Sequence, residues 1–171
     1  MSQTLSRSQR QVCAFTLGDH LFGIDVQYIQ EVFRFQECTP VPLTPSLVTG
    51  LLNLRGQIVM AIDLRERLGL PELQNEESPT SIVVRIDNGI LSFLVDELFD
   101  IMTLDVGQFE EIPETLSDTE KQFVTGCFKL ENRLLIMLDT QQVADISSDL
   151  RENLADIRRR REHRDSATSP S

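Results

Sequence analysis

One arginine interrupts a strongly apolar stretch, GLLNLRGQIVMAIDL, that runs from Gly50 to Leu64. Burying an unpaired guanidinium group is costly, so Arg55 is predicted to lie on a turn where its side chain stays in water. Gly56 follows it, and because glycine tolerates a positive φ the two residues are expected to form a hairpin tip. The chemistry expected of Arg55 is recognition, since its planar fork of donors can bind polar groups of a partner.

The groups that usually perform catalysis are few and scattered. The chain has two histidines, His20 in a predicted turn and His163 near the C-terminus, and neither lies beside a candidate nucleophile in the sequence. The motifs GxxxxGK[ST], GxGxxG, HExxH and GxSxG are all missing from the sequence. We therefore expect neither an enzyme nor a bound cofactor.

Three cysteines, Cys13, Cys38 and Cys127, stand far apart in the chain. An odd number of cysteines without CxxC spacing argues against a disulfide framework and against a zinc site. The thiols are predicted to be reduced and buried, as free cysteines usually are.

An internal repeat shows which elements must position Arg55. The segment LVTGLLNLRGQIVMAIDL (47–64) aligns without gaps to FVTGCFKLENRLLIMLDT (123–140), at a constant offset of 76 residues. Each copy is predicted to be a β-hairpin, with its tip at Arg55-Gly56 or at Glu131-Asn132. The identical positions in the two copies are Val48, Thr49, Gly50, Leu54 and Asp63 in the first, and Val124, Thr125, Gly126, Leu130 and Asp139 in the second.

The strands of both hairpins are almost continuously apolar, which indicates that both faces are covered. Asn53, Gly56, Gly126 and Asn132 are interpreted as structural turn residues. Asp63 is predicted to cap a short helix, LRERLGL, that stops at Gly69. Further hairpins are expected around Gly18-Asp19 and around Asp87-Asn88-Gly89, and short strands at this spacing are typical of an all-β barrel or sandwich.

The repeat and the polar stretch PELQNEESPT divide the chain. We predict a flexible N-terminus (1–11), one domain (12–146) and a helical, basic tail (147–171) with a disordered end. Inside the domain we expect two lobes, roughly 12–70 and 81–143, joined by a linker at 71–80. The tail is predicted to begin as an amphipathic helix with one apolar face, formed by Leu150, Leu154 and Ile157.

The net charge of the chain limits which kinds of macromolecule it is expected to bind. The net charge is −11, and residues 149–171 contribute +1, so the remainder carries −12. Such an acidic body would repel a phosphate backbone, and we expect no nucleic-acid partner. The polar N-terminus lacks the apolar segment of a secretion signal and no run reaches the ~18 apolar residues of a membrane span, so a cytoplasmic protein without direct membrane insertion is expected.

Four blocks, in this order, resemble the CheW family of chemotaxis coupling proteins: FTLGDHLFGIDVQYIQEV, GLLNLRGQIVMAIDLR, SFLVDELFDIMTL and FVTGCFKLENRLLIMLD. The resemblance extends from about Val12 to Val143. It implies two pseudo-symmetric, five-stranded SH3-like barrels that share a hydrophobic core, with short helices and a C-terminal helical tail. Met60 departs from the family pattern, which often has proline at this position.

The resemblance also implies a function. Members of the family are non-catalytic adaptors that couple the cytoplasmic tips of chemoreceptors to the regulatory domain of a CheA-type histidine autokinase, within receptor arrays at the membrane. Arg55 falls on the arginine of the family's NLRG motif at the receptor-binding surface. Ile29, Glu31 and Gly50 match further positions of that surface, whereas Ile29 could equally be a core residue.

Two alternatives stay open at this point. The same adaptor role could serve a twitching or phototaxis pathway. A protein that binds a small molecule, such as a purine nucleotide, is the alternative from another class, and the missing phosphate loop and the acidic body count against it.

Overall fold

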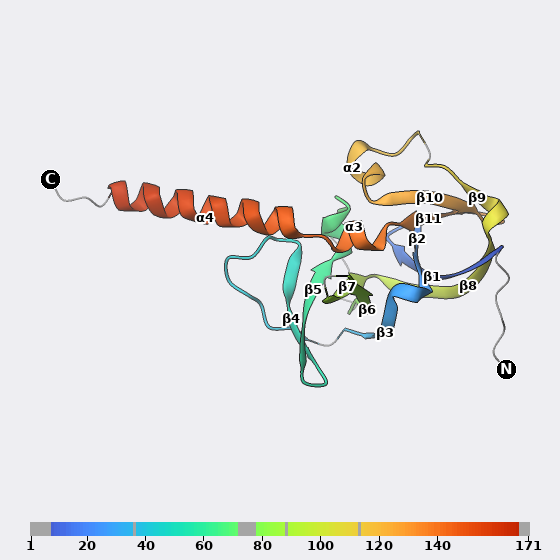
Figure 1. Cartoon of the computed structure of the whole chain (residues 1–171), viewed down its shortest axis with the longest axis horizontal. Helices are drawn as coiled ribbons and strands as arrows, with labels where there is room; N and C mark the ends of the chain where they lie inside the picture. The colour runs from blue at the N-terminus through green and yellow to red at the C-terminus, as the bar shows by residue number, and fades with distance from the viewer. Residues whose placement is uncertain (1–7, 36, 72–77, 88, 113, 168–171) are drawn as a thin grey trace.

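A computed structural model describes residues 8–35, 37–71, 78–87, 89–112 and 114–167, and these form two β-sheets with short helices and one long C-terminal helix (Figure 1). The predicted all-β class with a helical tail is confirmed. The first sheet has six strands in the order β8-β1-β2-β11-β10-β9. Its strands are β1 (Gln9–Leu17), β2 (His20–Asp25), β8 (Glu97–Asp105), β9 (Phe109–Glu110), β10 (Val124–Lys129) and β11 (Leu134–Leu138).

The second sheet has five strands in the order β3-β6-β7-β5-β4. They are β3 (Ile29–Arg34), β4 (Val48–Leu54), β5 (Gln57–Asp63), β6 (Thr80–Ile86) and β7 (Gly89–Val95). The helical elements are η1 (Val26–Tyr28), α1 (Leu64–Arg67), η2 (Val106–Gln108), α2 (Asp118–Lys121), α3 (Thr140–Ala144) and α4 (Ser147–Ala167).

Alternating residues of the strands serve two different cores, which explains their continuous hydrophobicity. On β1, Cys13 and Phe15 enter a large cluster that also contains Ile82 and Phe93 of the second sheet. Their neighbour Ala14 enters a cluster made by the first sheet alone. Because neighbouring side chains of a strand point to opposite faces, both faces must be apolar. The large cluster joins the two sheets, as the shared core implied by the family resemblance would.

The repeat is preserved in three dimensions. Each repeated hairpin pairs in parallel with a strand from elsewhere in the chain: β5 with β7, and β11 with β2. Asp63 and Asp139 both cap the helix that follows, by accepting hydrogen bonds from the backbone N–H of Arg65 (2.9 Å) and of Gln142 (3.1 Å). The predicted capping role of Asp63 is confirmed.

The sheets divide the chain differently from the lobes expected at 12–70 and 81–143. The N-terminal strands β1 and β2 join the C-terminal strands β8 to β11, and the middle of the chain, β3 to β7, forms the other sheet. The parallel pairing of β11 with β2 imposes this exchange, because it inserts the second hairpin beside the N-terminal one. The expected lobe boundaries are therefore corrected: the first lobe is discontinuous in sequence.

The predicted boundaries at the ends also need correction. Residues 9–11, expected in a flexible N-terminus, belong to β1 and pair with β8. The tail is helical from Ser147 to Ala167, but Leu154 is 55% exposed and only Leu150 packs against the shared core. The predicted apolar face of this helix is thus not buried beyond its first turn. The expected disordered end (168–171) and most of the expected linker (72–77) lie outside the described residues.

Candidate binding surface

The tip of the β4–β5 hairpin presents Arg55. Arg55 and Gly56 have φ values of +52° and +85°, the pattern of a two-residue type I′ turn. The Oδ1 atom of Asn53 accepts a hydrogen bond from the Gly56 N–H at 3.0 Å, which fixes the turn. Asn53 and Gly56 thus take part in this turn, which holds the Arg55 side chain at the end of the sheet.

Arg55 pairs with a carboxylate from another strand. Its Nη1 atom lies 3.4 Å from Oε2 of Glu31 on β3, and the two side chains are 81% and 21% exposed. An ion pair this exposed contributes little to stability, so its main effect is to orient the guanidinium. The sequence assigned both residues to one surface through the family resemblance, but residues 24 positions apart gave no sign of a direct contact.

Ile29 points away from this pair. A β-bulge between Ile29 and Glu31 places them opposite Val84 and Val83, two successive residues of β6. Successive residues of a strand face opposite sides of a sheet, so the bulge sends the two side chains in opposite directions. Ile29 is half-buried and packs against the shared core, in agreement with the core role considered from the sequence.

Gly50 is a packing position in this structure. It is buried, and a Cβ atom there would lie 2.5 Å from the carbonyl oxygen of Thr39 and 2.8 Å from Sγ of Cys38. Its counterpart Gly126 lies inside β10, at a bulge rather than in a turn, and a Cβ there would overlap the Phe109 ring and the Glu110 carbonyl. The predicted turn role of Gly126 is therefore wrong.

The second hairpin is closed by a short connection that contains Asn132. Asn132 lies in the connection between β10 and β11, which is closed by a 2.9 Å hydrogen bond from the Leu130 N–H to the Arg133 carbonyl. Neither Glu131 nor Asn132 has a positive φ, so this tip differs in conformation from the first.

Two arginines of α1 connect the sheets and the tail, and neither contact has a local sequence pattern that would predict it. Arg65 donates to both carboxylate oxygens of Asp96, with 2.7 Å between Nε and Oδ1. Asp96 also accepts from the Gly18 N–H at 2.7 Å. Burial alone would raise the pKa of Asp96, but these hydrogen bonds and the Arg65 charge hold that pKa below its usual value.

Arg67 binds the segment that connects α3 to α4. Its guanidinium donates to the carbonyl of Val143 at 3.0 Å, to the carbonyl of Asp145 at 2.6 Å and to the carboxylate of Asp149 at 2.7 Å. It also stacks over the Phe123 ring, 4.6 Å from the ring centre. The start of α4 is therefore fixed to the body.

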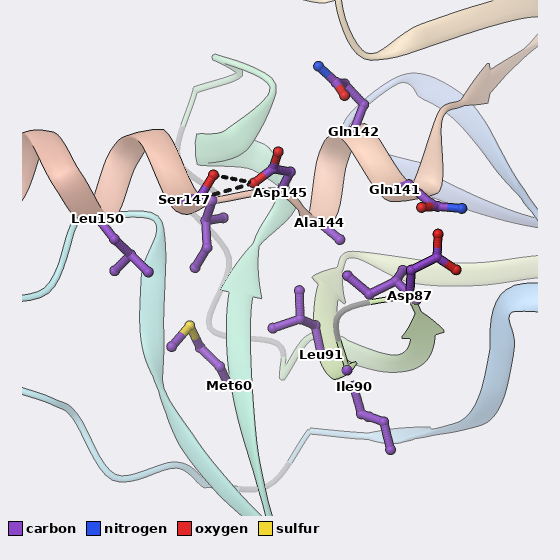
Figure 2. Close-up of a pocket in the computed structure, with 13 residues that line it drawn as sticks. Met60, Asp87, Ile90, Leu91, Gln141, Gln142, Ala144, Asp145, Ser147 and Leu150 are labelled. Atoms are coloured by element: carbon purple, nitrogen blue, oxygen red, sulfur yellow. Dashed lines mark hydrogen bonds between the residues drawn. The ribbon is translucent and has the colours of Figure 1, made fainter.

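A groove of about 420 Å³ separates the middle of β5 and the turn between β6 and β7 from α3 and the start of α4 (Figure 2). Met60, Leu91 and Leu150 form its apolar part, while the carboxylates of Asp87 and Asp145 lie at its edge. Among the described residues that line it none is positively charged, and carboxylates would oppose an anionic phosphate. The groove therefore does not favour the nucleotide-binding alternative.

The described side chains offer little for catalysis. Within the described ranges no group of three or more His, Cys, Asp or Glu side chains could hold a metal ion. Burial raises the pKa of the Cys13 thiol to about 11, and the pKa values of Cys38 and Cys127 are also raised, first by burial and then by nearby glutamates. Thiols with raised pKa values are poor nucleophiles at neutral pH.

None of the helices in the described part of the chain is both long enough and apolar enough to span a membrane. The longest of them, α4, has six arginines among its 21 residues.

Comparison with known proteins identifies the family. The model of the CheW-like domain matches residues 11–147. The chemotaxis protein CheW of Klebsiella aerogenes is 31% identical over 129 residues, which cover 75% of this chain and 78% of that protein. The CheW protein of Rhizobium meliloti is 28% identical over 139 residues, covering 81% and 90% of the two chains.

A solved structure agrees with these sequence matches. The scaffolding protein TtCheW from Thermoanaerobacter tengcongensis superposes with a TM-score of 0.69 at 27% sequence identity, over 76% of this chain and 88% of that one. With two sheets, a shared core and a sequence match over most of its length, this chain belongs to the CheW-like family of chemotaxis scaffold proteins.

Proposed function

We propose that this protein couples the cytoplasmic tip of a chemoreceptor to the regulatory domain of a CheA-type histidine kinase. In this role it is a non-catalytic, cytoplasmic adaptor that is recruited to receptor arrays at the membrane. The observation that carries the proposal is the β4–β5 tip, where an exposed arginine is held by a defined turn and oriented by Glu31.

The tip suits a polar, helical partner. A guanidinium that is 81% exposed keeps most of its five donors available for carboxylates or backbone carbonyls of a receptor. Its ion pair with Glu31 already restricts the side chain to few orientations in the free protein. The side chain therefore loses less conformational entropy on binding, which reduces the entropic cost of association. Arg55 and Glu31 would contact the receptor, while Gly50 and Ile29 would support the strands behind them.

Titration calorimetry with a receptor cytoplasmic fragment and, separately, with a kinase regulatory domain tests the proposal. We expect dissociation constants near micromolar for the unmodified chain, which correspond to roughly −8 kcal/mol. Arg55→Glu should weaken receptor binding at least about tenfold, because it removes the donors and places like charge beside Glu31. Kinase binding should change by less than about twofold, since the variant alters only the receptor contact.

The matched control is Arg133→Glu, which reverses an exposed arginine in the connection between β10 and β11. It should leave receptor affinity within about twofold of the unmodified chain. Equal losses from Arg55→Glu and Arg133→Glu would mean that net charge governs binding, and the proposed contact would be abandoned.

A further inference from the structure

The distal half of α4 carries a run of four arginines that lies beyond the anchored start of the helix. α4 begins at Ser147, where the match to the CheW-like domain ends, and its 21 residues span about 31 Å. Arg158, Arg159, Arg160 and Arg161 are all exposed, and among the described residues the one ion pair made by this run joins Arg159 to Asp156 of the same helix at 2.6 Å. These guanidinium groups are available to a partner.

The direction of this helix is fixed at its base. Arg67 holds the carbonyl groups before α4 and the Asp149 carboxylate within its first turn. Asn153, one turn further, donates to the carbonyl of Leu43. From this anchor α4 extends away from both sheets along the long axis of the molecule (Figure 1). The basic segment therefore cannot fold back onto its own body without breaking the anchor.

The opposite end of the molecule carries complementary charge. Between Arg85 and Lys121 the sequence has ten Asp and Glu residues and no Lys, Arg or His. This stretch includes β8, which lies at the open edge of the first sheet and has β1 as its one strand neighbour among the described strands. Glu97, Asp100 and Asp105 of β8 are exposed.

The same strand presents apolar side chains to solvent. Leu98 and Ile101 are 42% and 56% exposed. They lie opposite Phe15 and Cys13 of β1, both of which enter the shared core. Residues directly opposite in an antiparallel pair share a face, so the apolar face of the core continues outward onto β8. Glu97 and Asp100 lie opposite Thr16 and Ala14 of β1, so they project from the other face of this edge strand, and a partner that lies along the open edge would meet both sets of side chains.

We propose that the distal part of α4 binds along the open edge of β8 in a second copy of this chain. The arginines of the helix would pair with Glu97 and Asp100 on one side of this edge, while Leu154 would cover part of the strip formed by Leu98 and Ile101 on the other. Because α4 and β8 lie at opposite ends of the molecule (Figure 1), each copy would bind the next in a head-to-tail manner. Such heterologous contacts do not close into a dimer, so the assembly grows with concentration.

Other classes of partner fit the helix less well. Between Arg158 and Asp165 the helix carries no apolar side chain, so this segment lacks the face that would enter a membrane interface. A nucleic acid would be repelled by the rest of the chain, which carries −12. An acidic protein surface is compatible with both features, and the chain itself supplies one.

Sedimentation velocity on the full chain, from about 10 to about 300 µM, tests the proposal. We expect the weight-average mass to rise past that of a dimer at low salt and to return to the monomer at about 0.5 M salt, where screening is strong. The single variant Arg160→Glu should weaken self-association about threefold. Arg151→Glu, an equal charge reversal on the same helix near its anchor, should weaken it less than about 1.5-fold.

Complementary variants separate recognition from loss of folding. Arg158→Glu/Arg160→Glu/Arg161→Glu leaves the Arg159–Asp156 pair intact, and Glu97→Lys/Asp100→Lys reverses the charge along the β8 edge. Each variant alone should remain monomeric, because its helix and strand carry like charge, and an equimolar mixture of the two should associate again. The proposal would be overturned if the unmodified chain were a monomer at every concentration, or if the mixture of the two variants stayed monomeric. Neither result depends on receptor or kinase binding.

Discussion

The β4–β5 and β10–β11 hairpins share a framework but differ at their tips. Both contain a buried glycine at a bulge, Gly50 or Gly126, against which a neighbouring segment packs closely. Both end at an aspartate that caps the following helix. The tips, in contrast, are Arg55-Gly56 with two positive φ values and Glu131-Asn132 with none.

The helices that follow the hairpins differ in the same way. At the offset of 76 residues, Arg65 and Arg67 of α1 correspond to Gln141 and Val143 of α3. The two arginines bind Asp96 and the start of α4, whereas Val143 is buried in the shared core. The repeated glycines and aspartates are thus positions that the packing of each hairpin and the capping of the following helix require. Contacts that are made once in the molecule come from positions where the copies differ.

The largest effect is expected at the repeated glycines. Gly50→Ala and Gly126→Ala should each lower the free energy of unfolding by about 3 kcal/mol, because the new methyl group meets backbone atoms that cannot move without separating strands. The loss should be greater at Gly126, where the Phe109 ring is also in the way. Urea unfolding followed by circular dichroism measures both values.

Gly56→Ala is the control for this comparison. No heavy atom lies within 4 Å of a Cβ built at Gly56, so the substitution adds strain from its φ of +85° and no overlap. The expected cost is about 1 kcal/mol. If Gly50→Ala were no more destabilising than Gly56→Ala, close packing would not be the reason for the repeated glycines.

A smaller effect is expected at the contact that the second copy lacks. Asp96→Asn should lower the free energy of unfolding by about 2 kcal/mol at pH 7, since Arg65 and the Gly18 N–H lose a charged acceptor. The pKa of Asp96 is lowered in the folded state, so its stabilising effect is present above the unfolded pKa of about 3.9 and is lost as the pH falls through the folded pKa.

The difference in the free energy of unfolding between the unmodified chain and Asp96→Asn should therefore be constant from about pH 7 to pH 5 and should decrease below about pH 4. Glu97→Gln changes the neighbouring exposed carboxylate. Its free energy of unfolding should differ from that of the unmodified chain by less than about 0.5 kcal/mol at pH 7. A pH-independent loss in Asp96→Asn would show that its charge is not what stabilises the fold.

Local features of both hairpins could be predicted from the sequence, and long-range pairing could not. Asn53, Gly56 and Asp63 act within a few residues of themselves, so their residue types were sufficient to assign their roles. The continuous hydrophobicity of the strands also indicated correctly that both faces are covered.

The exchange of strands between sheets has no local signature. The pairing of β11 with β2 joins residues more than 100 positions apart and depends on how the two sheets pack around the shared core. The bulge that turns Ile29 away from Glu31 likewise depends on the register against β6. The side-chain contacts of Arg67 also follow from this packing, and that is why the anchor of α4 was missed.

The smallest effect on stability is expected from the Arg55–Glu31 pair itself. A double-mutant cycle with Arg55→Ala and Glu31→Ala should give a coupling energy of about 0.5 kcal/mol in low salt, because an ion pair with an 81% exposed partner is well solvated. The exposed pair between Lys129 and Glu110, 3.1 Å apart on β10 and β9, should give a similar value. Both couplings should shrink at about 0.5 M salt.

The Arg55–Glu31 and Lys129–Glu110 pairs should differ in their effect on receptor binding. Arg55→Ala should weaken receptor binding several-fold, whereas Lys129→Ala should not, although both cost the fold equally little. A coupling above about 2 kcal/mol for Arg55 and Glu31 would instead make this pair part of the structural framework. In that case the β4–β5 tip would be a structural part of its sheet. The receptor-binding surface would then have to be sought at other positions where the two copies of the repeat differ.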